Sequence, residues 1–291
     1  MDAFFFYPWL FPLFVTIFGL IIGSFLNVVI YRLPQMMTLA WKQDFAETFP
    51  EYEIPITDKP VTLSRPHSFC PHCHHPIRPW HNIPVISWLF LRGKCAYCQE
   101  KISARYPLIE LVSATASCVI ALHTGMTLYT AALLLFTFAV IAAAMIDLDT
   151  MLLPDSITLP LMWGGILLSL AGLSPMSLDS AVIGAIAGYL SLWSVYWIFK
   201  LLTKKEGMGY GDFKLFAALG AWMGWQMLPI IIFIASIIGI MFGVTFLLMK
   251  KDDINQGFPF GPSLAIAGWL CLIWGADILN WYSLILTGTG G

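Results

Sequence analysis

The stretch Gly207-Met-Gly-Tyr-Gly-Asp212-Phe-Lys214 places an aspartate behind three alternating glycines, at the mouth of an apolar segment. A second acidic stretch, Ile146-Asp147-Leu-Asp149, ends another apolar segment about 65 residues earlier. Carboxyl groups at the ends of apolar segments cost free energy unless they are solvated or paired, so acids in such places are candidates for function. The rest of the chain indicates which environment holds these two stretches.

The composition is that of a membrane protein. Of its 291 residues, 58% are hydrophobic and only 11% are charged, whereas a soluble domain has about 25% charged residues. Long apolar runs recur, which predicts an all-α integral membrane protein. The net charge of −2 gives no reason to expect a nucleic acid partner. The first apolar stretch lacks a basic n-region and a small-residue cleavage site, so we expect it to be retained as a span.

The apolar runs predict about eight transmembrane helices. They lie at 9–30, 108–122, 128–146, 157–173, 181–202, 213–227, 229–249 and 263–286. Gly-x-x-x-Gly patterns at Gly19 and Gly23, and at Gly184 and Gly188, predict close helix packing. The polar segment 32–106 is the only stretch long enough for an extramembrane domain. We therefore expect a first span in 1–31, a polar domain in 32–106 and seven further spans in 107–291.

The 15 lysines and arginines gather in three places, and this distribution tests the number of spans. Nine lie in 32–105, four flank the connection between the fifth and sixth spans, and two follow the seventh span. With eight spans all three groups lie on one face, which the positive-inside rule makes the cytoplasmic face. Both termini are then expected outside, in the periplasm of a Gram-negative cell. The same parity puts the 147–156 connection and the 207–212 stretch together at the cytoplasmic face.

Four cysteines in the polar segment predict a metal site. They form two Cys-x-x-Cys pairs, 21 residues apart: Cys70, Cys73, Cys95 and Cys98. This spacing is typical of one tetrahedral zinc ion bound by four thiolates, a closed shell that indicates a structural role. Redox chemistry and an iron–sulfur cluster are the less favoured alternatives. Four histidines lie near the pairs and could replace a thiolate, but we expect them to be solvated loop residues: His72, His74, His75 and His81.

The acidic residues predict a different kind of site. Asp147 directly continues an apolar run and is the most deeply embedded of three neighbouring aspartates. Asp149 would face another side of the helix, and Asp155 follows Pro154 and suits a helix N-cap. Two facing carboxyl groups can share a proton, so that one acts as base and the other as acid on a water molecule that attacks a peptide carbonyl. No Gly-x-Ser-x-Gly or His-Glu-x-x-His motif competes.

These features together resemble the type IV prepilin peptidases, the bacterial branch of the Gly-x-Gly-Asp membrane aspartyl proteases. The resemblance covers nearly the whole chain. It is carried by 23–34, by both cysteine pairs with 102–110, by 146–155, by 207–212, and by Phe260-Gly-Pro262. The combination is highly specific.

The resemblance implies that Asp147 and Asp212 are the catalytic pair. It also implies that the substrates are type IV prepilins and type II secretion pseudopilins, cleaved behind a glycine after a short basic leader at the inner membrane. Many members with the cysteine domain also methylate the new N-terminal amine with S-adenosylmethionine. The resemblance therefore implies the same activity for this chain, with no residues assigned to binding the methyl donor. The rival hypotheses are a proton- or cation-coupled transporter, whose acids would lie near the midplane, and a membrane methyltransferase without protease activity.

Overall fold

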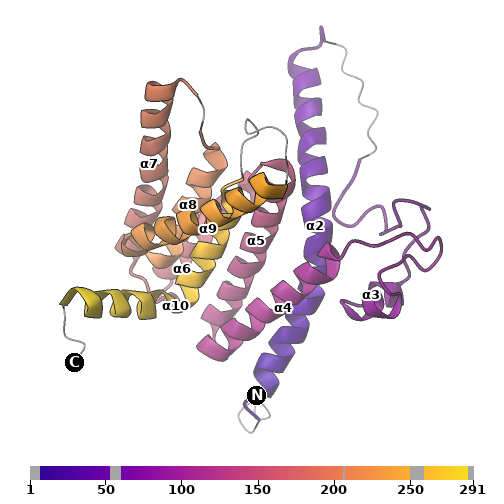
Figure 1. Cartoon of the computed structure of the whole chain (residues 1–291), viewed down its shortest axis with the longest axis horizontal. Helices are drawn as coiled ribbons and strands as arrows, with labels where there is room; N and C mark the ends of the chain where they lie inside the picture. The colour runs from indigo at the N-terminus through magenta and orange to yellow at the C-terminus, as the bar shows by residue number, and fades with distance from the viewer. Residues whose placement is uncertain (1–6, 53–59, 206, 250–258, 288–291) are drawn as a thin grey trace. The chain divides into compact units, whose positions relative to one another are not determined.

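The structure is a computed structural model that describes residues 7–52, 60–205, 207–249 and 259–287. Within these ranges it contains helices and two isolated β-bridges but no β-strand (Figure 1). The helix contacts divide the chain into two units, 1–130 and 131–291. The predicted all-α architecture is confirmed.

The first unit is built on two helices that pack against each other, α2 (Leu10–Thr48) and α4 (Arg105–Thr124). Gly19 and Gly23 lie at their contact. A Cβ at Gly23 would lie only 2.8 Å from the Cα of Glu110, and one at Gly19 would lie 2.5 Å from Ser117 Oγ. The two glycines therefore let the backbones approach closely, as the sequence pattern predicts.

The described residues of the polar segment between α2 and α4 have little regular structure beyond η1 (Pro79–Asn82) and α3 (Ile86–Phe90). It is tied to α2 by Arg32, which is 7% exposed and donates to the carbonyls of Thr62, Leu63 and Pro66 at 2.7–3.3 Å. The helix itself continues well past Arg32, through Pro34 to Thr48. The residues that follow Pro34 are mostly good helix formers, which explains this extension beyond the predicted span.

The second unit holds the remaining helices. They are α5 (Leu128–Thr150, from residue 131), α6 (Asp155–Leu170), α7 (Leu178–Thr203), α8 (Tyr210–Met223), η2 (Trp225–Met227), α9 (Leu228–Met249) and α10 (Gly261–Thr287). Among them α8 is the most enclosed, because α6, α7 and α10 all contact it and its residues from Phe213 to Met223 are almost all buried.

Small residues allow this enclosure of α8. A Cβ at Gly184 of α7 would collide with the carbonyl oxygen of Gly220, and a Cβ at Gly188 would lie 2.7 Å from that of Phe216. On the α6 side, Trp222 packs against Gly165, and its Nε1–H donates to the carbonyl of Leu161 at 2.7 Å. The close packing predicted at Gly184 and Gly188 is thus confirmed.

Six of the described helices are long and apolar enough to cross a membrane: α2, α4, α5, α7, α9 and α10. Every predicted span overlaps a separate α-helix, the two additional ones being α6 and α8, and the predicted span 213–227 runs past α8 into η2. These have 16 and 14 residues, or about 24 and 21 Å at 1.5 Å per residue, against a hydrocarbon core of about 30 Å. The multi-span fold is confirmed, and the number of eight crossings stays a prediction, as does the division at residues 31 and 106.

Candidate active site

Asp147 lies near the C-terminal end of α5, where the apolar run meets a turn. It is 5% exposed, and its Oδ2 accepts a hydrogen bond of 3.0 Å from the backbone N–H of Gly261, the first residue of α10. The turn after α5 is closed by Met151, whose N–H donates to the carbonyl of Asp147 at 2.8 Å from a left-handed backbone with φ of 54°. The Asp147 carboxyl group is therefore held between the end of one helix and the start of another.

Asp212 lies in the first turn of α8, which begins after the N-cap Gly209. It is 7% exposed, and its Oδ1 is buried without a hydrogen-bond partner. The start of the helix is fixed by Phe213, which is fully buried and contacts the rings of Tyr196 and Tyr210 at centroid distances of 5.6 and 5.3 Å. A helix N-terminus favours a negative charge, and the unpartnered oxygen leaves one acceptor position open for a ligand.

The two carboxyl groups belong to one site within the second unit. They are near enough for the negative charges to repel each other. Leu153 contacts the glycine beside each acid. On the Asp147 side, a Cβ at Gly261 would lie 3.1 Å from Leu153 Cδ1 and 2.6 Å from Asp147 Oδ2. On the other side, a Cβ at Gly211 would lie 2.6 Å from Leu153 Cβ. Through Leu153 the two acidic stretches lie side by side, as the sequence analysis expects.

The three glycines before Asp212 differ in what they contact. Gly211 packs against Leu153, and a Cβ at Gly207 would lie 2.8 Å from the ring of Phe199. A Cβ at Gly209 would meet only Asp212 Oδ2, at 3.7 Å, and Gly211 N. None of the three has the left-handed backbone that favours glycine. Two of them thus serve close packing, and Gly209 leaves open space beside the acid.

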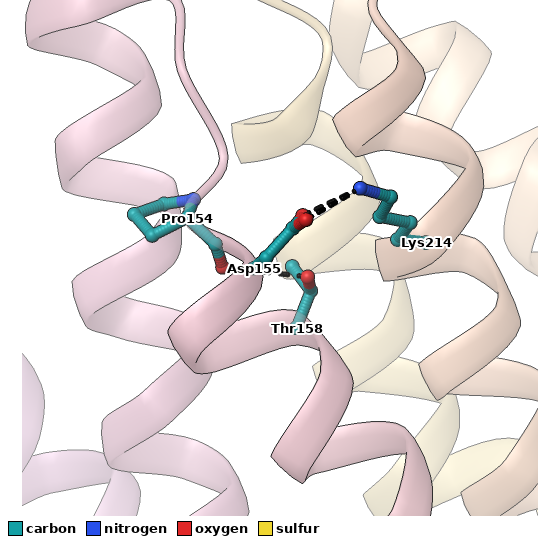
Figure 2. A network of polar contacts seen from close by, with 4 residues as sticks. All are labelled: Pro154, Asp155, Thr158 and Lys214. Carbon is teal, nitrogen blue, oxygen red and sulfur yellow. Dashed lines mark hydrogen bonds and ion pairs between the residues drawn. The ribbon is translucent and has the colours of Figure 1, made fainter. Parts of the chain in front are cut away.

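The other aspartates of the 147–155 stretch lie apart from this pair. Asp149 is exposed. Asp155 is the first residue of α6, and both its carboxylate oxygens bind Lys214 Nζ, at 2.6 and 2.7 Å (Figure 2). The N-cap expected at Asp155 is wrong: Pro154 is the cap residue, and its carbonyl accepts hydrogen bonds from Thr158 (Figure 2). The Asp155 carboxylate joins α6 to α8 because a lysine lies opposite.

In the first unit, the four cysteines converge on one point. Their Sγ atoms all lie within 4.8 Å of one another, and Cys70 and Cys98 Sγ are 3.8 Å apart. Four sulfurs at about 2.3 Å from a tetrahedral zinc ion would be about 3.8 Å apart. The donor set and its spacing therefore fit a zinc ion.

The two cysteine pairs have the same backbone geometry. Cys70 N–H donates to the carbonyl of His75, and Cys95 N–H donates to that of Glu100. The residue after each second cysteine, His74 or Gln99, has a left-handed backbone with φ of 56° or 60°. Backbone N–H groups of Cys98 and Tyr97 face the Cys95 sulfur and lower the pKa of its thiol, which favours the thiolate that a metal binds.

Three of the neighbouring histidines, His74, His75 and His81, lie against aromatic rings. The metal-holding group found among the described residues consists of the four cysteines. His75 lies against Tyr97 with ring centroids 3.7 Å apart, His81 also contacts Tyr97, and His74 contacts Phe69. His72, His74 and His75 are nevertheless exposed, as the sequence analysis expects, and His81 is half-buried.

Sequence reasoning missed two contributors to the acidic site. Gly261, which donates to Asp147, stands in the motif Phe260-Gly-Pro262, but nothing in the motif indicates the hydrogen bond. Leu153 lies inside the 146–155 stretch without a polar group to single it out. Only the fold brings these residues together.

The fold and the site define a helical, multi-pass membrane protein with a pair of buried carboxyl groups. Two family models match the chain: the bacterial peptidase A24 N-terminal domain over residues 17–124, and the type IV leader peptidase family over residues 134–244. The chain belongs to the type IV leader peptidase family.

Three curated relatives that bear the name prepilin leader peptidase/N-methyltransferase are similar to the chain over almost their full length. One from Aeromonas hydrophila is 53% identical over 275 residues, which are 94% of each chain. One from Pseudomonas aeruginosa is 49% identical over 95% of this chain and 94% of its own, and one from Neisseria gonorrhoeae is 46% identical over 94% and 95%. No solved structure matches the chain significantly.

Proposed function

We propose that this protein is a membrane aspartyl endopeptidase that removes the basic leader of type IV prepilins and type II secretion pseudopilins. The observation that carries the proposal is the pair of buried carboxyl groups, Asp147 from α5 and Asp212 from α8, in one site. The names of the relatives supply the substrate class. The same names support a second activity, methylation of the new N-terminal amine.

In the proposed mechanism the two acids divide the work of a metal-free hydrolysis. Asp147 suits the ionised base, because its Oδ2 accepts the Gly261 N–H, and a hydrogen bond of this kind stabilises a carboxylate. Asp212 suits the protonated acid, because its buried Oδ1 has no hydrogen-bond donor, and this loss of solvation opposes the effect of the helix N-terminus on its charge. Asp147 takes a proton from the attacking water while Asp212 donates one to the carbonyl oxygen, and the roles reverse when the leaving amine is protonated.

The substrate has a basic leader followed by an apolar helix, and the charge distribution of the chain supports a matching orientation. The lysines and arginines gather on one predicted face, so we place the acidic site and the cysteine segment at the cytoplasmic face of the bacterial inner membrane and the termini in the periplasm. The apolar helix of the substrate lies beside the spans in this arrangement, and the scissile bond lies at the depth of the two aspartates.

The proposed metal is a structural zinc ion bound by Cys70, Cys73, Cys95 and Cys98. The spacing of the sulfurs and the matching backbone turns of the two cysteine pairs support it. It stabilises a segment that has little core of its own. S-adenosylmethionine is the proposed methyl donor, supported by the relatives' names alone. We assign no residue to its binding.

The test is incubation of the purified protein with a purified prepilin, with and without S-adenosylmethionine, and intact-mass analysis of the products. The expected result is loss of the leader in both reactions and a further gain of one methyl group when the donor is present. Methylation without any leader cleavage would favour the rival methyltransferase. Ion flux in liposomes together with an uncut prepilin would favour the transporter.

A further inference from the structure

The short helix α3 presents an apolar face to its surroundings. Ile86, Leu89 and Phe90 are spaced i, i+3 and i+4, so they lie on one side of the helix, and they are 52%, 61% and 85% exposed. The opposite side is fixed to the cysteine segment: Ser87 is buried, and Trp88 Nε1–H donates to the carbonyl of Ile102 at 3.2 Å. Because Ser87 and Trp88 fix the opposite side of α3, the exposed apolar face is not a result of loose packing.

The helix α3 lies beside the first turns of α4. Val85, which precedes α3, donates its N–H to Glu110 Oε2 at 2.7 Å. Glu110 is five residues into α4, the membrane-crossing helix that begins at Arg105, or about 7.5 Å along its axis. The polar interface of a bilayer is about 5–8 Å thick on each side. This hydrogen bond thus fixes α3 beside the first turns of α4 (Figure 1).

The surroundings of α3 are basic and aromatic. The sequence has no acidic residue from 60 to 99. Arg92 and Lys94 follow α3 directly and are exposed, and Arg78 lies over the ring of Trp80, which is 57% exposed. Apolar side chains flanked by basic residues and interfacial tryptophan are typical of segments that lie in the headgroup region of an anionic bilayer.

We propose that α3 is an interfacial anchor whose partner is the lipid bilayer itself. Ile86, Leu89 and Phe90 enter the boundary between headgroups and acyl chains, and Arg92 and Lys94 contact anionic headgroups. Because Cys95 follows five residues after Phe90, the anchor fixes the distance of the four-cysteine site from the membrane surface. This role is independent of peptidase activity. A negative crosslinking result would reject the anchor alone, and a negative cleavage assay would reject the proposed function alone.

The test is photocrosslinking of the full-length protein in nanodiscs of phosphatidylethanolamine and phosphatidylglycerol. p-Benzoylphenylalanine replaces Phe90 in one variant and, as a matched control, Tyr52 in another. Tyr52 is 61% exposed and follows the end of α2, 20 residues beyond Arg32. A single size-exclusion peak checks that each variant is folded, and mass spectrometry identifies the adducts.

The expected result is that lipid adducts form at Phe90 roughly tenfold more than at Tyr52. The adducts should fall to the Tyr52 level when Leu89→Asp is added, and should decrease in phosphatidylcholine nanodiscs. Equal adducts at the two positions would overturn the proposal. It would equally be overturned if Phe90 crosslinked mainly to residues 131–291, or to added prepilin in place of lipid.

Discussion

Replacement of Gly261 by alanine should displace the Asp147 carboxyl group without unfolding the protein. The new Cβ would lie 2.6 Å from Asp147 Oδ2, whereas ordinary contact begins at 3.4 Å, so the carboxyl oxygen must move by about 0.8 Å. The oxygen is the end of a side chain, so it can rotate away at low cost to stability.

The catalytic cost of this displacement should be large. A misplacement of about 1 Å in a catalytic group can reduce the rate about 100-fold, so we expect Gly261→Ala to lower kcat for leader cleavage by roughly 10- to 100-fold. KM should change little, because the substitution acts on the acid and not on the substrate contacts.

The assay is initial-rate cleavage of a purified prepilin, together with thermal melting of the detergent-solubilised variant. Gly243→Ala in α9 is the matched control, since a Cβ there meets nothing within 4 Å, and it should cleave at the wild-type rate. Wild-type cleavage by Gly261→Ala would refute the proposed role of the Gly261–Asp147 contact. A large loss of melting temperature would instead show that the substitution acts through the fold.

Three further substitutions test other parts of the account. Gly220→Ala places a Cβ against the Gly184 carbonyl, where backbone atoms cannot rotate away, and should destabilise the α7–α8 contact by about 1–3 kcal/mol; an unchanged melting midpoint would contradict this. Cys95→Ser should abolish zinc binding and expose the polar segment to limited proteolysis while the second unit stays resistant; one zinc per chain in the variant would be the contrary result. Asp155→Ala removes the ion pair with Lys214, whose side chains are 55% and 28% exposed, and should cost at most about 1 kcal/mol; a melting shift of more than a few degrees would show a larger role.

The sequence predicted the helices well, because they depend on local pattern. An apolar run that ends at Asp147 places that residue at a helix end whatever the tertiary fold. The number of predicted spans and the positions of the lysines and arginines put Asp147 on the same predicted face as Asp212. The structure brings the two residues into one site. The Gly-x-x-x-Gly patterns likewise predicted backbone approach, since only small residues permit it.

The parts that could not be predicted depend on contacts between distant residues. Asp155 looked like an N-cap because Pro154 precedes it, but Lys214, 59 residues later, pairs with its carboxylate. Gly261 is 114 residues from Asp147, and no periodicity connects them. The helix α2 extends past the predicted boundary because helix propensity continues beyond the end of the apolar run.

The central claim is that Asp147 and Asp212 are both required to cleave the leader. The most direct measurement is prepilin cleavage by purified Asp147→Asn and Asp212→Asn, each checked for folding by thermal melting. Asparagine has nearly the same shape and keeps an oxygen that can accept the Gly261 N–H, but it cannot exchange a proton at the pH of the assay. Both variants should fold and leave the prepilin intact. Full cleavage by either one would contradict the central claim.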